Sequence, residues 1–123
     1  MIRLAIYYTP PQQSPLSKAA AEWLGRTSLS LSYPGRQPAH TITDERFRAI
    51  IASPFHYGFH GTIKPPFRLT HGATIDQVAD RLKKFAAGYH SFILPPLAVS
   101  SMNDFFCLRP TEPCPQLQRL AND

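Results

Sequence analysis

The sequence predicts a single α+β domain whose sheet is mainly antiparallel. Stretches in which apolar and polar side chains alternate, as they do along half-buried strands, are separated by segments in which apolar residues recur every three or four positions, as they do along helices. The last two predicted strands follow each other directly, which favours antiparallel pairing. The chain has 123 residues, of which 43% are hydrophobic and 17% charged, a composition typical of one folded domain.

A strand and a helix are predicted within the first 25 residues. Residues 2–8 alternate, with one face formed by Ile2, Leu4, Ile6 and Tyr8, and Pro10-Pro11 then ends the strand. Ser14 followed by Pro15 is a typical helix start, because serine caps the first turn and proline suits the first helical position. Gly25 suits the C-terminal cap. The apolar stripe of this helix consists of Leu16, Ala19, Ala20, Trp23 and Leu24.

The next segment predicts an extended stretch and a short helix. Leucine and tyrosine alternate with serine over residues 29–33, which indicates a strand or an edge segment, and Pro34-Gly35 turns the chain. Thr41 or Thr43 then caps a short helix that is stopped by Pro54. Its apolar side is formed by Phe47, Ile50 and Ile51.

The clearest element is a helix from Thr74 to Tyr89. Thr74 and Gln77 have the spacing of a capping box. The apolar residues at three- and four-residue steps are Ile75, Val78, Leu82, Phe85 and Tyr89.

A hairpin and a short helix follow. Residues 92–100 and 105–109 are predicted strands joined by a turn at Asn103-Asp104. Leu117, Leu120 and Ala121 begin an amphipathic helix, and the chain is expected to end inside this element. The thirteen prolines are about double the usual ~5%, and pairs such as Pro65-Pro66 and Pro95-Pro96 predict strand ends and stiff loops.

Polar side chains alternate along one segment, YGFHGTIKPPFRL, from Tyr57 to Leu69. If the segment is extended, His60, Thr62 and Lys64 share one face, while Phe59, Gly61 and Ile63 point into a core. An imidazole moves protons near neutral pH, and a hydroxyl and an ammonium bind oxyanions. The three residues therefore suit a phosphate, although the same alternation is also that of an ordinary solvated strand face.

The run His60-Gly61-Thr62-Ile63 resembles the H-x-T-hydrophobic signature of the two-histidine phosphoesterase superfamily. Together with the opening RLAIYYTP, a SPL…WLGR segment and the flanking YGF and KPPF, it resembles a bacterial family of unknown function labelled as phosphonate-metabolism proteins. The resemblance covers most of residues 1–110. It implies one lobe of a bilobal fold in which each lobe supplies one such motif to a shared cleft.

The resemblance also implies roles for individual residues. His60 would be one of an acid/base pair of histidines, and Thr62 the hydroxyl that holds phosphoryl oxygens. Independently of the resemblance, Lys64 and Arg68 lie four residues apart and carry the charge to attract phosphate, unless they are ordinary surface side chains with snorkelling stems. Tyr57 either stacks on a base or ribose or covers the edge of the core, and Tyr7 would flank the motif strand.

No second H-x-T or H-x-S motif occurs in the sequence. The other four histidines are followed two positions later by Ile42, Gly58, Ala73 and Phe92. We therefore expect residues 1–123 to form a single lobe that lacks its second half, and expect the isolated chain to be inactive. The missing half would be a C-terminal lobe or a second copy of the chain.

The charge of the chain suits an anionic partner. The net charge is +5 and the pI is near 9.6, but no more than two basic residues are adjacent, so a nucleic-acid stripe is weakly supported. His56 and His60 are four residues apart, but Pro54 and Gly58 predict a bend there, and no metal or cofactor is expected. Cys107 and Cys114 have no metal-type spacing, and no signal peptide or long apolar run is seen, which is the pattern of a cytoplasmic protein.

Three functions remain open. In the first, the chain would be half of a phosphoesterase that acts on a phosphodiester, a cyclic phosphate or a phosphonate-pathway ester. Alternatively, it is a non-catalytic module that binds an anion or nucleotide, or a structural fragment. In the first two cases the expected partner is a small molecule that contains phosphate, and no membrane is involved.

Overall fold

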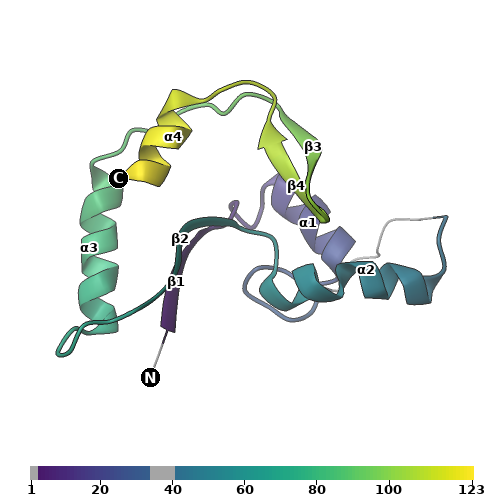
Figure 1. The fold of residues 1–123 in the computed structure, drawn as a ribbon, viewed down its shortest axis with the longest axis horizontal. Helices are drawn as coiled ribbons and strands as arrows, with labels where there is room; N and C mark the ends of the chain where they lie inside the picture. The colour runs from purple at the N-terminus through teal and green to yellow at the C-terminus, as the bar shows by residue number, and fades with distance from the viewer. Residues whose placement is uncertain (1–2, 34–40) are drawn as a thin grey trace. The chain divides into compact units, whose positions relative to one another are not determined.

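Two small antiparallel sheets and four helices form the fold in the computed structural model, which describes residues 3–33 and 41–123 (Figure 1). In chain order the elements are β1 (Arg3–Tyr8), α1 (Pro15–Leu24), α2 (Asp44–Tyr57), β2 (Gly61–Arg68), α3 (Ile75–Ala87), β3 (Leu97–Met102), β4 (Phe105–Pro110) and α4 (Pro115–Asn122). β1 pairs with β2, and β3 pairs with β4. The α+β class predicted from the sequence is confirmed.

The chain divides into two compact units. Residues 5–65 form one unit, and residues 1–4 together with 66–123 form the other. The boundary falls within β1 and β2, so each unit contains part of both strands. The organisation of residues 1–123 as a single lobe stays a prediction.

The core of the 5–65 unit lies between α1 and α2. Leu24, Phe47 and Ile51 are buried against one another, and Ile42 and Phe59 pack onto this cluster. The Trp23 ring meets the Phe47 ring edge to face, with 5.0 Å between centroids, an arrangement that aromatic pairs favour.

Local capping explains where α1 and α2 begin and end. The side chains of Ser14 and Thr43 accept hydrogen bonds from backbone N–H groups three residues later, as predicted for Ser14 and for one of the two threonines considered. Gly25 closes α1 in the left-handed conformation, with φ 73°, which glycine adopts without strain. The predicted start and end of α1 are confirmed.

The prediction that Pro54 stops the second helix is wrong. α2 continues to Tyr57, and Pro54 lies inside its last turn. Proline removes one helical hydrogen bond there, since it has no N–H to donate to the carbonyl four residues earlier. The turn is nevertheless held, because the Gly58 N–H donates to the Pro54 carbonyl (2.8 Å) and the Arg26 side chain donates to the next two carbonyls.

Residues 29–33 form no strand, which was one of the two alternatives predicted there. The Thr27 hydroxyl accepts hydrogen bonds from the N–H groups of Leu29 and Ser30, at 3.2 and 2.8 Å. Such local hydroxyl bonds compete with strand pairing and form turns instead. The turn predicted at Pro34-Gly35 lies outside the described residues.

β2 begins later than predicted and runs through a proline pair. It starts at Gly61, so Tyr57 belongs to α2 and His60 stands at the entrance to the strand. Pro65-Pro66 lie within β2 rather than at its end, a correction to their expected role. Successive N–H groups of a strand point to opposite edges, so only one of the two missing donors lies on the side of β1. The other lies on the unpaired edge, where it breaks no ladder bond.

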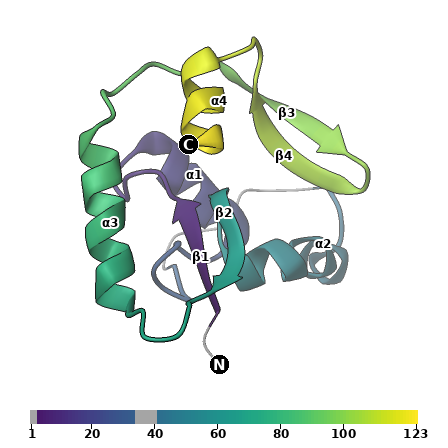
Figure 2. The same ribbon diagram turned by 60° about the vertical axis from the view of Figure 1, so that its left-hand side comes forward.

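Local patterns correctly predicted the elements of the other unit. Thr74 and Gln77 form both hydrogen bonds of the capping box at the start of α3. β3 and β4 form the predicted hairpin (Figure 2). Met102 lies opposite Phe105, and Asn103 has φ 53° in the turn. β3 begins at Leu97 rather than at residue 92, directly after Pro95-Pro96.

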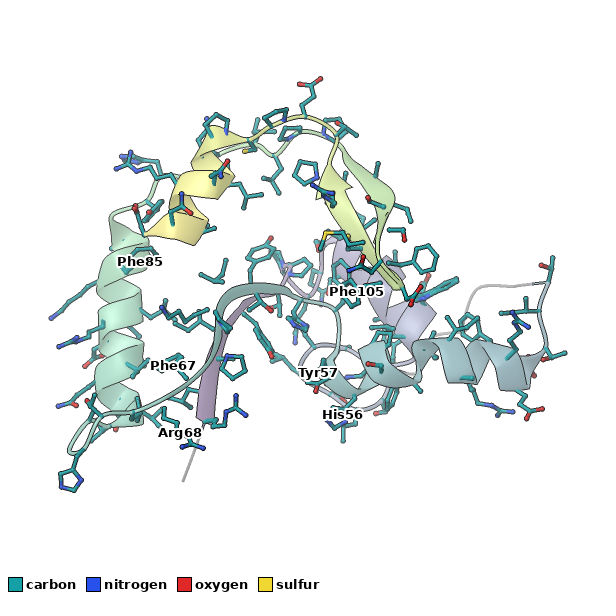
Figure 3. All side chains as sticks on the ribbon, viewed as in Figure 1. His56, Tyr57, Phe67, Arg68, Phe85 and Phe105 are labelled. Carbon is teal, nitrogen blue, oxygen red and sulfur yellow. The ribbon has the colours of Figure 1, made fainter. Side chains whose placement is uncertain are left out.

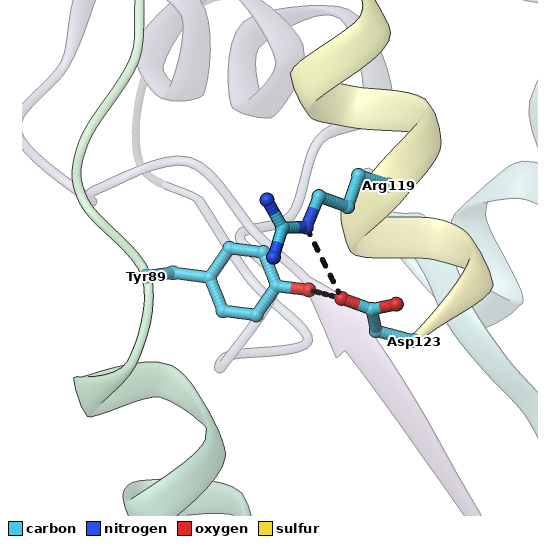
Figure 4. A network of polar contacts seen from close by, with 3 residues as sticks. All are labelled: Tyr89, Arg119 and Asp123. Carbon is cyan, nitrogen blue, oxygen red and sulfur yellow. Dashed lines mark hydrogen bonds and ion pairs between the residues drawn. The ribbon is translucent and has the colours of Figure 1, made fainter.

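Side chains from the region after α3, from α4 and from the residue that follows α4 meet in a polar network. The Tyr89 hydroxyl donates a hydrogen bond to the Asp123 carboxylate, and Arg119 Nε lies 3.6 Å from the same oxygen (Figure 4). The hydrogen bond to Asp123 is the main cause that raises the pKa of Tyr89 above 10.0, because it stabilises the neutral phenol. In residues 3–33 and 41–123, no helix has the length and apolar character needed to cross a membrane.

Candidate functional site

The site predicted from the sequence lies at the turn between α2 and β2. Gly58 ends α2 with φ 74° and ψ 171°, a combination that is essentially restricted to glycine. The bend predicted at this position is therefore confirmed. Directly after it, Phe59 packs onto the α1–α2 core, which anchors the turn next to His60.

His60 is half-buried and has one ring nitrogen engaged. Its Nδ1 lies 2.8 Å from the Gly58 carbonyl oxygen. A carbonyl only accepts hydrogen bonds, so Nδ1 must carry the proton in this contact. In the neutral ring the lone pair is then on Nε2, which is the nitrogen available as a base.

Tyr7 stacks on His60. The two ring centroids are 3.9 Å apart and the ring planes differ by 24°. Tyr7 comes from β1, the strand that pairs with β2, which agrees with the expectation that it flanks the motif strand. The stacked phenol restricts rotation of the imidazole about its side-chain torsions. The stacking therefore fixes the plane of the ring, and the hydrogen bond of Nδ1 fixes which edge of the ring faces the Gly58 carbonyl.

Thr62 and Lys64 lie exposed on β2, while Ile63 between them is partly buried. For these three residues the alternation is the one predicted for the motif strand. Gly61, however, is exposed and has open space where a side chain would be, so the prediction that it points into the core is wrong. The hydroxyl and the ammonium are accessible to a ligand, and both are within four residues of His60.

Tyr57 extends from the last turn of α2 beside His56 (Figure 3). Their rings meet edge to face, with centroids 4.9 Å apart. Tyr57 is 58% exposed, and its role in stacking or in covering the core edge stays a prediction. His56 is helical and does not share a strand face with His60, and residues 3–33 and 41–123 contain no cluster of three potential metal ligands.

Arg68 lies in the other unit, where it lines a groove beside α3. The groove has a volume of about 510 Å³, within the range of roughly 300–1,000 Å³ typical of small-molecule pockets. Phe67 and Arg68, labelled in Figure 3, stand at the end of β2 and contribute to its wall. Its charged residues are Arg68, Arg81, Lys84 and Asp80, and the excess of basic groups favours an anion.

The sequence assigned no role to Arg26, which the structure places directly behind the motif turn. Its guanidinium donates to the carbonyls of Phe55 (2.8 Å), His56 (3.1 Å) and Thr27 (2.9 Å). Arg26 is only 8% exposed. Its position directly after the capping Gly25 is the one local signal, but its partners on α2, Phe55 and His56, are 29 and 30 residues away along the chain.

Comparisons with known proteins found a matching family and two curated relatives, but no matching solved structure. It is 31% identical over 121 residues to a ribose 1,5-bisphosphate phosphokinase PhnN of Janthinobacterium sp. (strain Marseille), covering 98% of this chain and 27% of that protein. It is 32% identical over 120 residues to the protein of the same name from Laribacter hongkongensis (strain HLHK9), covering 98% and 28%. The chain thus spans about a quarter of the length of the curated relatives it matches. No solved structure gave a significant match.

A family model described as "Protein of unknown function (DUF1045)" matches residues 62–123, half of the chain. The match begins at Thr62, two residues after His60, and includes β2 from that point, both hairpin strands and the last two helices. The chain therefore belongs to the DUF1045 family.

Proposed function

We propose that the chain carries one half of a two-histidine phosphoesterase site, in which His60 is the acid/base residue and Thr62 holds phosphoryl oxygens. The observation that carries the proposal is the hydrogen bond from His60 Nδ1 to the Gly58 carbonyl, since it leaves the basic Nε2 on the side of the ring that faces away from this carbonyl. The Tyr7 ring stacked on the imidazole supports it, because a general base needs a fixed orientation as well as a lone pair.

In this mechanism, Nε2 of His60 takes a proton from an attacking water or hydroxyl, or returns one to the leaving oxygen. The Thr62 hydroxyl donates to a phosphoryl oxygen, and the Lys64 ammonium balances its charge. The second histidine would come from a further lobe or from another copy of the chain.

Substrate class is proposed from two sources. The curated relatives are named for a phosphorylated ribose, ribose 1,5-bisphosphate, and the resemblance noted in the sequence is to phosphonate-metabolism proteins. We therefore propose a phosphate ester of a sugar or nucleotide within phosphonate metabolism. The kinase activity in the relatives' name is not proposed for this chain, which spans about a quarter of their length.

Phosphate titration followed by NMR tests the binding half of the proposal. Inorganic phosphate is expected to shift backbone and imidazole resonances of residues 57–68, and Thr62→Val and Lys64→Gln are expected to weaken the response. Lys18→Gln, which removes an exposed lysine on α1 in the same unit, is the matched control and should change nothing. Shifts spread over the thirteen Lys and Arg residues would refute the site.

Turnover tests the catalytic half. The chain by itself should hydrolyse a 2′,3′-cyclic nucleotide at least 10²–10⁴-fold more slowly than a complete two-histidine site, roughly the contribution of one general acid or base. Steady hydrolysis by the pure chain that is abolished by His60→Ala would contradict this expectation. It would instead indicate that two copies of the chain pair their His60 side chains.

A non-catalytic anion-binding module is the second candidate, and the groove beside α3 is the observation that favours it. Arg68, Arg81 and Lys84 line this groove around an apolar wall that includes Phe67. Under this function, the double substitution Arg81→Gln/Lys84→Gln would abolish phosphate binding, whereas Thr62→Val would leave it intact. The opposite result favours the phosphoesterase half-site.

A further inference from the structure

Arg26 carries a positive charge into a position where water is largely excluded. A buried charge is costly unless hydrogen bonds compensate it, and here main-chain carbonyls do so. Two of them, from Phe55 and His56, belong to the last turn of α2, where unpaired carbonyls carry partial negative charge. Arg26 thus caps the C-terminal end of α2 from a distant part of the chain.

The same guanidinium also lies near Gly58, at a distance that would admit one methyl group. A Cβ atom placed on Gly58 would be 3.6 Å from both Cζ and Nε of Arg26. Glycine is the most permissive residue for backbone rotation, so its unusual φ and ψ must be held by neighbouring groups. Arg26 supplies such a neighbour on one side, and the hydrogen bond from the Gly58 N–H to the Pro54 carbonyl restrains the other end of the residue.

The orientation of the Gly58 peptide determines the state of the His60 ring. Its carbonyl oxygen accepts the Nδ1 proton, and a rotation of that peptide would withdraw the acceptor. A neutral imidazole can carry its proton on either nitrogen, and the hydrogen bonds that the ring makes determine which one. A change two residues before His60 would therefore alter which nitrogen is basic.

We propose that Arg26 is a positioning residue for His60, acting through the end of α2 and Gly58 to keep the proton on Nδ1 and the lone pair on Nε2. This inference rests on the proposed function for its significance in catalysis, but the tautomer that it specifies is measurable without turnover. Removal of the guanidinium is expected to change the tautomer of His60 even when the helices remain folded.

The test is a two-bond ¹H–¹⁵N correlation spectrum of the ¹⁵N-histidine-labelled 123-residue chain, recorded well above the ordinary histidine pKa of about 6.5. In the parent protein, His60 is expected to give the pattern of the Nδ1–H tautomer. Arg26→Met, which keeps the length of the side chain but removes its donors, is expected to shift His60 toward the Nε2–H tautomer. Arg48→Met, an exposed arginine on α2, is the matched control and should leave the pattern unchanged.

A folded Arg26→Met protein with an unchanged His60 tautomer would overturn the inference. If that variant does not fold, Arg26→Gln replaces it, because glutamine keeps a donor near the position of Nε and removes the reach of Nη1 to α2. An unchanged tautomer in folded Arg26→Gln would then overturn the inference in the same way.

The phosphate response separates this inference from the proposed function. In one outcome, the His60 tautomer depends on Arg26 but the His60 resonances of the parent protein do not shift with phosphate. This result would support positioning by Arg26 and refute the phosphate site. A His60 that responds to phosphate with the same tautomer in all folded variants would support the site and refute the role of Arg26.

Discussion

The two units of the chain differ in how their elements are stabilised. In the 5–65 unit, α1 and α2 share a core of buried side chains, whereas α3 and α4 of the other unit have no residue that is fully buried among the described residues. α3 nevertheless has the clearer apolar stripe and the more complete N-terminal cap. The contrast teaches that local signals decide whether a helix forms, while long-range packing decides whether its apolar face is covered.

Loss of a core ring should have the largest effect. Phe47→Ala is expected to lower the free energy of unfolding by about 3–5 kcal/mol, because Phe47 is 2% exposed and its removal leaves a cavity. Phe106→Ala in the other unit, where the ring is 74% exposed, is the control and should cost far less. Urea unfolding followed by circular dichroism measures both, and equal losses would remove the distinction between the units.

Removal of the helix caps should lower the free energy of unfolding by a smaller amount, and the fraying that it causes should differ between the two units. Thr74→Ala deletes the capping box of α3 and Ser14→Ala deletes the cap of α1, each with a cost of about 1 kcal/mol. We expect amide exchange to show that the first turn of α3 frays after Thr74→Ala, because no buried contact holds it. α1 should stay protected after Ser14→Ala, since its C-terminal Leu24 is anchored in the core, and equal fraying would contradict the contrast.

The smallest effect concerns pH and the Tyr89–Asp123 contact. The pKa of Tyr89 is raised, chiefly by its hydrogen bond to Asp123, so this contact is present below pH 10.0 and is lost as pH rises through the raised value. Asp123→Asn should therefore move the Tyr89 titration to lower pH. Ultraviolet absorbance, with Tyr89→Phe subtracted, measures the midpoint.

Glu112→Gln is the control for this titration, because it removes one negative charge in the same unit at an exposed position outside the Tyr89 network. It should leave the midpoint of Tyr89 in place. A shift as large as that of Asp123→Asn would indicate a general effect of charge rather than the hydrogen bond.

The sequence predicted those elements whose signals are local. Ser14 and Thr74 mark helix starts, Gly25 a helix end and Asn103 a turn, and each acts on residues within one turn of itself. Pro54 was misinterpreted because the compensation for its missing N–H comes partly from Arg26, whose partners on α2 are separated from it by 29 and 30 residues. No periodicity in the sequence encodes such a contact.

The candidate site was predictable in composition but not in detail. The motif indicates His60 and Thr62, yet which ring nitrogen is basic depends on the conformation of Gly58, and that depends on contacts across the unit. The stacking of Tyr7 on His60 likewise requires that β1 and β2 pair, which alternation within each strand does not specify.

The consecutive prolines of β2 have a consequence for self-association. Successive N–H groups along a strand point to opposite edges, so Pro65 and Pro66 delete one donor on the side of β1 and one on the outer side. An incoming strand from another molecule would find an interrupted row of donors on the outer edge. β2 is therefore a poor template for growth of an intermolecular sheet, and the accessible motif face can stay open to a ligand without inviting aggregation along its own strand.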